Sequence, residues 1–149
     1  MTVVSNSSPL IILAKLECFD LLNRLIPRLY ISAEVQHEVV VSGAGLPGAS
    51  EVAKAEWIEA KPLPNPAGLL ALLDDYHARK LAKAEGLQVR GTVGLLETFC
   101  LRAHLPDLRA TFQQLLRHSY IDQQLLDLRL RTLRLPPLWA GGWLAVLWT

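Results

Sequence analysis

The chain has 149 residues, of which 51% are hydrophobic and 19% are charged, and its formal net charge is +1. This composition excludes a disordered chain, which would combine low hydrophobicity with high net charge, and the length suits one compact domain. The small net charge also excludes a broad electrostatic attraction to nucleic acid, so any nucleic-acid site has to be a local basic patch.

Cysteine usage and the N-terminal pattern indicate a reducing compartment. Cys18 and Cys100 each lie in an apolar helical pattern, which is typical of buried thiols rather than of a disulfide, and no His or Cys cluster has zinc spacing. The polar run at 6–9 interrupts the apolar N-terminal stretch that a signal peptide needs. No apolar run approaches the roughly 20 residues that span a bilayer. We therefore expect a cytoplasmic protein with no membrane segment.

The first sixty residues alternate short apolar strands with helices. Ser8 followed by Pro9 predicts a helix start, because a hydroxyl accepts from free amides and proline has no N–H to lose. Ser32 predicts a second cap. The predicted elements are a strand at 3–4, helices at 8–14 and 19–26, a strand at 29–31, a helix at 33–41, a short helix at 50–55 and a strand at 57–60. Repeated strand, cap and helix indicates βα units and a parallel sheet.

The second half continues the alternation and then becomes helical. A proline-rich connection at 62–66 leads to an ambiguous apolar run at 69–73, which we interpret as a strand because acids and a helix follow it. The further predicted elements are a helix at 76–85 ended by Gly86, a strand at 87–89, and helices that begin near Thr92, Asp107 and Asp122. We expect one domain over 1–135 and an apolar, tryptophan-rich tail over 136–149 that is packed on the body or disordered.

Polar side chains follow the predicted strands. Asn6 with Ser7 and Ser8 follows the first strand, Glu38 lies on the helix after the second, and Asp74 with Asp75 follows the strand at 69–73. Oxygen ligands of this kind at the carboxyl edge of a parallel sheet suit Mg²⁺ or Mn²⁺. Simpler roles remain open: Asn6 as a turn former, Glu38 as a solvated helix residue, and either aspartate as a helix cap.

Four segments, in order along the chain, resemble a prokaryotic PIN-domain family that is similar to the toxin components of toxin–antitoxin pairs. The first is Val-Val-Ser-Asn-Ser-Ser-Pro-Leu-Ile at 3–11, and the others lie at 30–40, 73–82 and 86–96. The resemblance runs from residue 3 to about residue 133. Each motif alone is weak, and their order makes the set specific.

The resemblance implies a three-layer α/β/α sandwich with a mostly parallel sheet, in which acidic residues hold Mg²⁺ or Mn²⁺ and RNA is cut. By position, Asn6 replaces the first acid of the family, Glu38 and Asp74 are the catalytic carboxylates, and Asp75 is the neighbour of Asp74 in the sequence. The implied metal ligands are Asn6, Glu38, Asp74 and Asp75, and the implied substrate-binding residues are Ser8, Arg79 and Thr92. The implied partners are RNA, a cognate antitoxin and further copies of the chain.

One departure from the family concerns the segment before the strand at 69–73. The family carries an acidic helix there, whereas here Asn65-Pro66-Ala67-Gly68-Leu69 leads almost directly into the strand. One central helix and one carboxylate are therefore missing, and activity is expected to be impaired. The alternatives are an inactive PIN-like module that binds RNA or a protein, and a nucleotide-binding domain that uses the Ser7-Ser8-Pro9 helix start without a glycine-rich phosphate loop.

Overall fold

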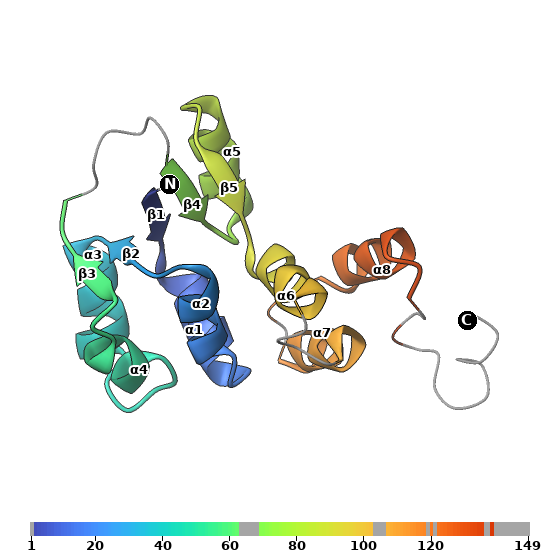
Figure 1. Ribbon diagram of the computed structural model, residues 1–149, viewed down its shortest axis with the longest axis horizontal. Coiled ribbons are helices and arrows are strands. Elements are labelled where there is room, and N and C mark those ends of the chain that lie inside the picture. Colours follow the sequence, from blue (N-terminus) through green and yellow to red (C-terminus); the bar gives the residue numbers. More distant parts are fainter. Residues whose placement is uncertain are drawn as a thin grey trace. The chain divides into compact units, whose positions relative to one another are not determined.

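The computed structural model describes residues 2–62, 69–102, 107–118, 120, 122–135 and 138. The chain divides into two compact units, Met1–Thr98 and Phe99–Thr149 (Figure 1). Apart from Leu138, the predicted tail over 136–149 lies outside the described residues, so its packing and the boundary at residue 135 stay predictions.

The first unit is built on a five-stranded sheet in the order β3-β2-β1-β4-β5. Every neighbouring pair of strands is parallel, so the predicted α/β fold with a parallel sheet is confirmed. The strands are β1 (Thr2–Ser5), β2 (Leu29–Ile31), β3 (Ile58–Ala60), β4 (Leu69–Leu72) and β5 (Gln88–Arg90).

Helices follow the strands and lie in two groups. Figure 1 shows α1, α2, η1 and α4 together, and α5 apart from them beside β4 and β5. The chain moves from β1 through β2 to β3 in one direction across the sheet and from β4 to β5 in the other, so right-handed connections place the two groups on opposite faces. The helices are α1 (Ser7–Lys15), α2 (Phe19–Leu25), α3 (Ala33–Gln36), the π-helix η1 (His37–Ser42), α4 (Ala49–Lys54), α5 (Tyr76–Ala84) and α6 (Thr92–Leu101).

The core of this unit lies on both faces of the sheet, because successive strand residues point to opposite sides. Leu29, Ile31 and Leu72 share one face and are at most 1% exposed. Val4 and Ala71 belong to a smaller buried cluster on the other face. Burial on both faces explains why the three inner strands, β1, β2 and β4, read as apolar runs in the sequence.

Most element boundaries differ from the sequence predictions by one residue, and the helix predicted at 33–41 differs more. The first helix begins at Ser7, one residue earlier than predicted, with Asn6 at the N-cap position. The last strand is 88–90 instead of 87–89. The predicted helix at 33–41 changes after four residues into η1, whose wider turns end at Gly43. A Cβ at Gly43 would lie only 2.6 Å from the Val39 carbonyl oxygen, so the close approach of the backbone here requires glycine.

The connection from β3 to β4 is short for its span. It crosses β2 and β1, which is three strand spacings or about 14 Å, and it holds only residues 61–68. Parallel crossovers ordinarily need a dozen or more residues, most often with a helix. The short connection agrees with the prediction that one helix of the PIN-like pattern is missing before the strand at 69–73.

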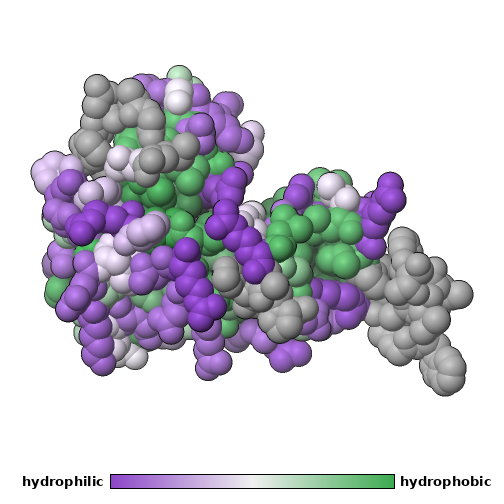
Figure 2. Space-filling model, viewed as in Figure 1, coloured by the Kyte–Doolittle hydropathy of each residue, from purple (hydrophilic) through white to green (hydrophobic). Residues whose placement is uncertain are grey.

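The second unit is helical. It contains the end of α6, then α7 (Leu108–Arg117) and α8 (Gln123–Thr132), which begin at the aspartate caps Asp107 and Asp122 as predicted. Figure 2 shows hydrophobic side chains at the surface of the molecule. Among the described residues of this unit, the exposed large apolar side chains are those of Leu101, Leu125 and Leu128. Within the described part of the chain, no helix combines the length and apolarity needed to cross a bilayer.

Candidate functional site

The candidate site lies at the carboxyl edge of the sheet, where β1 and β4 end side by side. Ser5 is in register with Leu72, and the Asn6 backbone N–H donates to the Leu72 carbonyl oxygen at 3.3 Å. The residues that follow the two strands therefore start from neighbouring positions. This edge is where ligands bind in open parallel sheets.

Asn6 presents a buried acceptor that receives no hydrogen bond from the described part of the chain. It occupies the N-cap position of α1 in an extended conformation, but its side chain makes no capping bond to the helix. Its Oδ1 atom is buried, and no hydrogen-bond partner lies among the described residues. An unsatisfied buried carbonyl oxygen is costly, so this atom marks a point where a donor or a cation would be stabilised.

Ser7 and Glu38 join the first helix to the π-helix. The Ser7 hydroxyl donates to Glu38 Oε2 at 2.5 Å, across 31 positions of sequence. Ser7 is only 6% exposed, whereas Glu38 lies in the exposed part of η1. A hydroxyl bonded to a carboxylate makes a short, strong contact, so Ser7 fixes Glu38 at the end of β1.

Asp74 is held by the first residue of α6. The Thr92 backbone N–H donates to Asp74 Oδ1 at 2.7 Å, and the Thr92 hydroxyl donates to Oδ2 at 2.6 Å. Thr92 is fully buried. Since both of its donors are used on Asp74, Thr92 is placed to position that carboxylate.

Gly91 leaves room for the side chains of Arg79 and Asp74 next to Thr92. A Cβ at this position would lie 2.4 Å from Arg79 Nη1 and 2.9 Å from Asp74 Oδ1. Arg79 Nη1 donates to the Leu73 carbonyl oxygen at 3.2 Å. The Arg79 guanidinium and the Asp74 carboxylate therefore both reach the space that any larger residue than glycine would fill.

Two other predicted site residues have different surroundings. Asp75 Oδ1 accepts from the Ala78 N–H at 2.8 Å and caps α5, which was one of the roles left open for it. Ser8 is exposed in the first turn of α1. The resemblance implied that Ser8 is the hydroxyl residue of the site, whereas the hydroxyl that contacts Glu38 is that of Ser7. The sequence pattern that could have identified Ser7 is its spacing from two apolar residues of the same helix. Ser7 lies three residues before Leu10 and six before Leu13, on the face of α1 that is buried.

The donor set suits a hard cation but is not tightly clustered. Carboxylate and amide oxygens are ligands that Mg²⁺ and Mn²⁺ prefer, and the orphaned Oδ1 of Asn6 fits a cation at that atom. Yet within the described ranges no three His, Cys, Asp or Glu side chains gather closely enough to hold a metal ion. The Asn6 amide oxygen and the carboxylates of Glu38 and Asp74 therefore form a sparse set of ligands.

Comparison with protein families gives two matches to one family model, described as a PIN domain. The matches cover residues 2–71 and 65–134. No curated protein matches the chain significantly. The two matches overlap at residues 65–71, which include the end of the short connection from β3 and most of β4.

Proposed function

The chain belongs to the PIN-domain family, and from this premise we propose that it is a divalent-metal-dependent ribonuclease whose site is Asn6, Glu38, Asp74 and Asp75. PIN domains are nuclease-like as a family. The observation that carries the proposal is the buried Asn6 Oδ1, which has no partner among the described residues and lies where β1 and β4 end side by side. Mg²⁺ or Mn²⁺ is the proposed cofactor, because the donors are hard oxygens.

In this proposal each residue has a separate task. Asn6, Glu38, Asp74 and Asp75 would hold the metal, and Asp75 also caps α5 through Oδ1. When bound, the metal supplies charge stabilisation at a phosphate oxygen and lowers the pKa of a bound water. Ser7 and Thr92 are positioning residues, because each donates a hydrogen bond to one of the carboxylates.

Substrate contacts are proposed for Ser8 and Arg79. Ser8 is exposed in the first turn of α1, where free backbone N–H groups favour phosphate. Arg79 is half-buried beside Asp74 and brings a cation to the same edge of the sheet. Thr92 was predicted with these two, but its burial and its two bonds to Asp74 favour a role through that carboxylate.

RNA cleavage tests the proposal directly. The wild-type chain and a Glu38→Gln/Asp74→Asn variant are incubated with single-stranded RNA and Mn²⁺ or Mg²⁺. These substitutions keep the shape and much of the hydrogen bonding but remove both charges. Glu34→Gln, an exposed residue of α3, is the matched control. We expect cleavage by wild type and control and a loss of at least a hundredfold in the double variant; equal rates in all three proteins would exclude catalysis at this site.

A second candidate function is an inactive PIN-like module that binds RNA or a protein partner. It is favoured by the lack of three clustered metal-binding side chains among the described residues and by the short connection from β3 to β4. Calorimetric titration with Mn²⁺ separates the two candidates. Tight Mn²⁺ binding that is lost in Asp74→Asn supports the enzyme, and RNA binding without Mn²⁺ binding supports the module.

The biological setting proposed for the enzyme is a toxin–antitoxin pair in the cytoplasm, with RNA as substrate, an antitoxin as inhibitor and further copies of the chain as partners. A small antitoxin-like gene directly upstream would support this setting. Co-expression provides the functional test, because a true antitoxin restores growth that the wild-type chain arrests and that the double variant does not arrest.

A further inference from the structure

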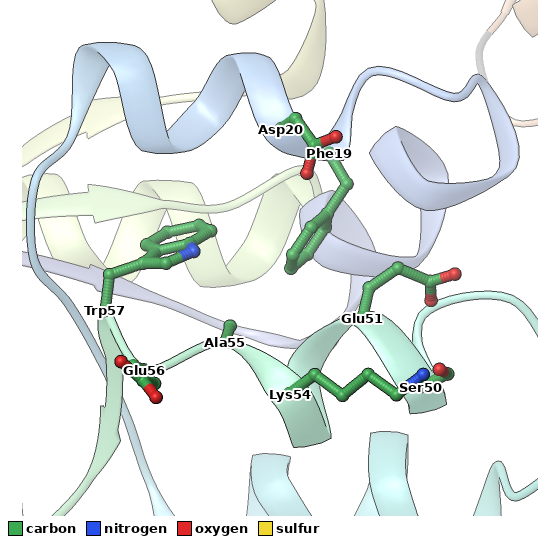
Figure 3. Close-up of a pocket in the computed structure, with 8 residues that line it drawn as sticks. All are labelled: Phe19, Asp20, Ser50, Glu51, Lys54, Ala55, Glu56 and Trp57. Atoms are coloured by element: carbon green, nitrogen blue, oxygen red, sulfur yellow. The ribbon is translucent and has the colours of Figure 1, made fainter.

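A cavity lies at the edge of the sheet opposite the candidate site. It is formed by the start of α2, one side of α4 and the turn that leads into β3, and its volume is about 460 Å³ (Figure 3). Trp57 directly precedes β3, and its carbonyl oxygen accepts from the Leu29 N–H at 2.9 Å at the start of β2. The cavity is therefore at the amino ends of β2 and β3 and shares no residue with the candidate metal site.

The floor of the cavity is aromatic. The rings of Phe19 and Trp57 pack with their centroids 5.6 Å apart and tilted by 47°, and Ala55 completes the apolar surface. Figure 3 shows the indole nitrogen of Trp57 turned toward the open space. This N–H makes no hydrogen bond to any described residue. The floor thus offers a flat apolar face together with one free donor.

The rim of the cavity is acidic. It carries the carboxylates of Asp20, Glu51 and Glu56 and a single ammonium group, that of Lys54. Glu51 is engaged by the Gly48 N–H at 2.6 Å, whereas Asp20 and Glu56 are exposed and make no hydrogen bond to any described residue. This excess of negative charge disfavours a phosphate and therefore an RNA backbone.

We infer that this cavity binds an arginine side chain from a basic segment of a partner protein. A guanidinium is planar and weakly hydrated, so it stacks on an indole face and donates in a fork to a carboxylate. Trp57 supplies the face, and Asp20 or Glu56 accepts the guanidinium N–H groups. A main-chain carbonyl of the same segment accepts from the indole N–H. Lysine, a compact and strongly hydrated charge, fits this combination less well.

The probe is the blocked peptide acetyl-Gly-Arg-Gly-amide, titrated into the full-length ¹⁵N-labelled chain. The readout is the indole N–H resonance of Trp57, which is identified by its loss in Trp57→Phe. We expect a saturable shift with the arginine peptide, at least threefold weaker binding of the lysine peptide, and no saturable shift with the uncharged citrulline peptide. No saturable shift with the arginine peptide, or equal binding of the citrulline peptide, would overturn the inference.

Charge variants test the rim without disturbing the aromatic floor. Asp20→Asn and Glu56→Gln are each expected to weaken binding by about two- to fivefold, which is the range of exposed ion pairs. Glu85→Gln, an exposed carboxylate at the end of α5, is the matched control and should bind as wild type does. Undiminished binding by an Asp20→Asn/Glu56→Gln variant whose backbone resonances match wild type would refute the role of the carboxylates.

Discussion

Replacing Thr92 by valine tests how the candidate site is held together. Valine keeps the branched shape of threonine but removes the hydroxyl that donates to Asp74 Oδ2 at 2.6 Å. The backbone N–H bond to Oδ1 at 2.7 Å remains. The substitution therefore removes one of two bonds that join the end of β4 to the start of α6.

The loss of stability expected for Thr92→Val follows from the charge of Asp74 and from the burial of the Thr92–Asp74 pair. Hydrogen bonds to charged groups contribute about 1.5–3 kcal/mol. Thr92 is fully buried, but Asp74 is partly exposed, so water replaces part of the lost bond. We expect Thr92→Val to lower the free energy of unfolding by about 1.5–2 kcal/mol, or to lower the Tm by roughly 3–8 °C for a chain of this size.

Urea unfolding followed by circular dichroism measures this cost, and amide exchange in β4 reports on the first unit separately. A double-mutant cycle with Asp74→Asn shows how much of the lost free energy of unfolding comes from the contact between Thr92 and Asp74. In the Asp74→Asn background the hydroxyl faces a neutral group, so Thr92→Val should cost no more than about 1 kcal/mol. Thr92→Ser is the control that keeps the hydroxyl, and it should lose only the contribution of one buried methyl group, roughly 0.8 kcal/mol.

Two results would refute this reasoning. If Thr92→Val left the free energy of unfolding unchanged, the hydroxyl would not be bonded to a carboxylate in solution. If the costs of Thr92→Val and Asp74→Asn were additive, the two side chains would not interact, and Thr92 could not position Asp74.

Three further perturbations probe other parts of the first unit. Gly43→Ala places a Cβ 2.6 Å from the Val39 carbonyl oxygen, so urea unfolding should show a loss of about 1–3 kcal/mol; a neutral effect would contradict the tight end of η1. Burial, aided by the charge of Glu17, raises the pKa of the Cys18 thiol, so the unfolded chain ionises first and stability should fall as the pH rises above about 8.5. That fall should be smaller in Cys18→Ala, and an identical pH dependence would exclude Cys18 as its source. Glu59→Gln breaks the exposed ion pair with Arg28 and should change the free energy of unfolding by less than about 0.5 kcal/mol, whereas a larger loss in the same urea assay would show that the pair is not simply solvated.

Local signals in the sequence determined the helix starts. Ser32, Asp107 and Asp122 were expected at the beginnings of helices, and each side chain accepts from a backbone N–H two or three residues ahead. Gly86 follows α5 with a φ of 79°, as its predicted place after the helix requires. Such caps are readable because donor and acceptor are neighbours in the chain, so no other element has to be placed first.

The alternation of apolar strands and helices likewise determined the parallel sheet, and the order of the PIN-like motifs determined the family. What the alternation leaves open is the order of the strands, because β4 follows β3 in sequence but lies beside β1. That order decides which polar residues share an edge, and it places the end of β4 next to Asn6.

Only the tertiary structure decided which polar side chains meet. Ser7 rather than Ser8 contacts Glu38, across 31 positions, and Thr92 holds Asp74 across 18. These choices depend on the face that α1 buries, on the wider turn of η1 and on strand register, and each is fixed by packing among distant segments. The sequence alone therefore determined the kind of oxygen donors at the sheet edge, while long-range packing decided their partners and left Asn6 Oδ1 without one among the described residues.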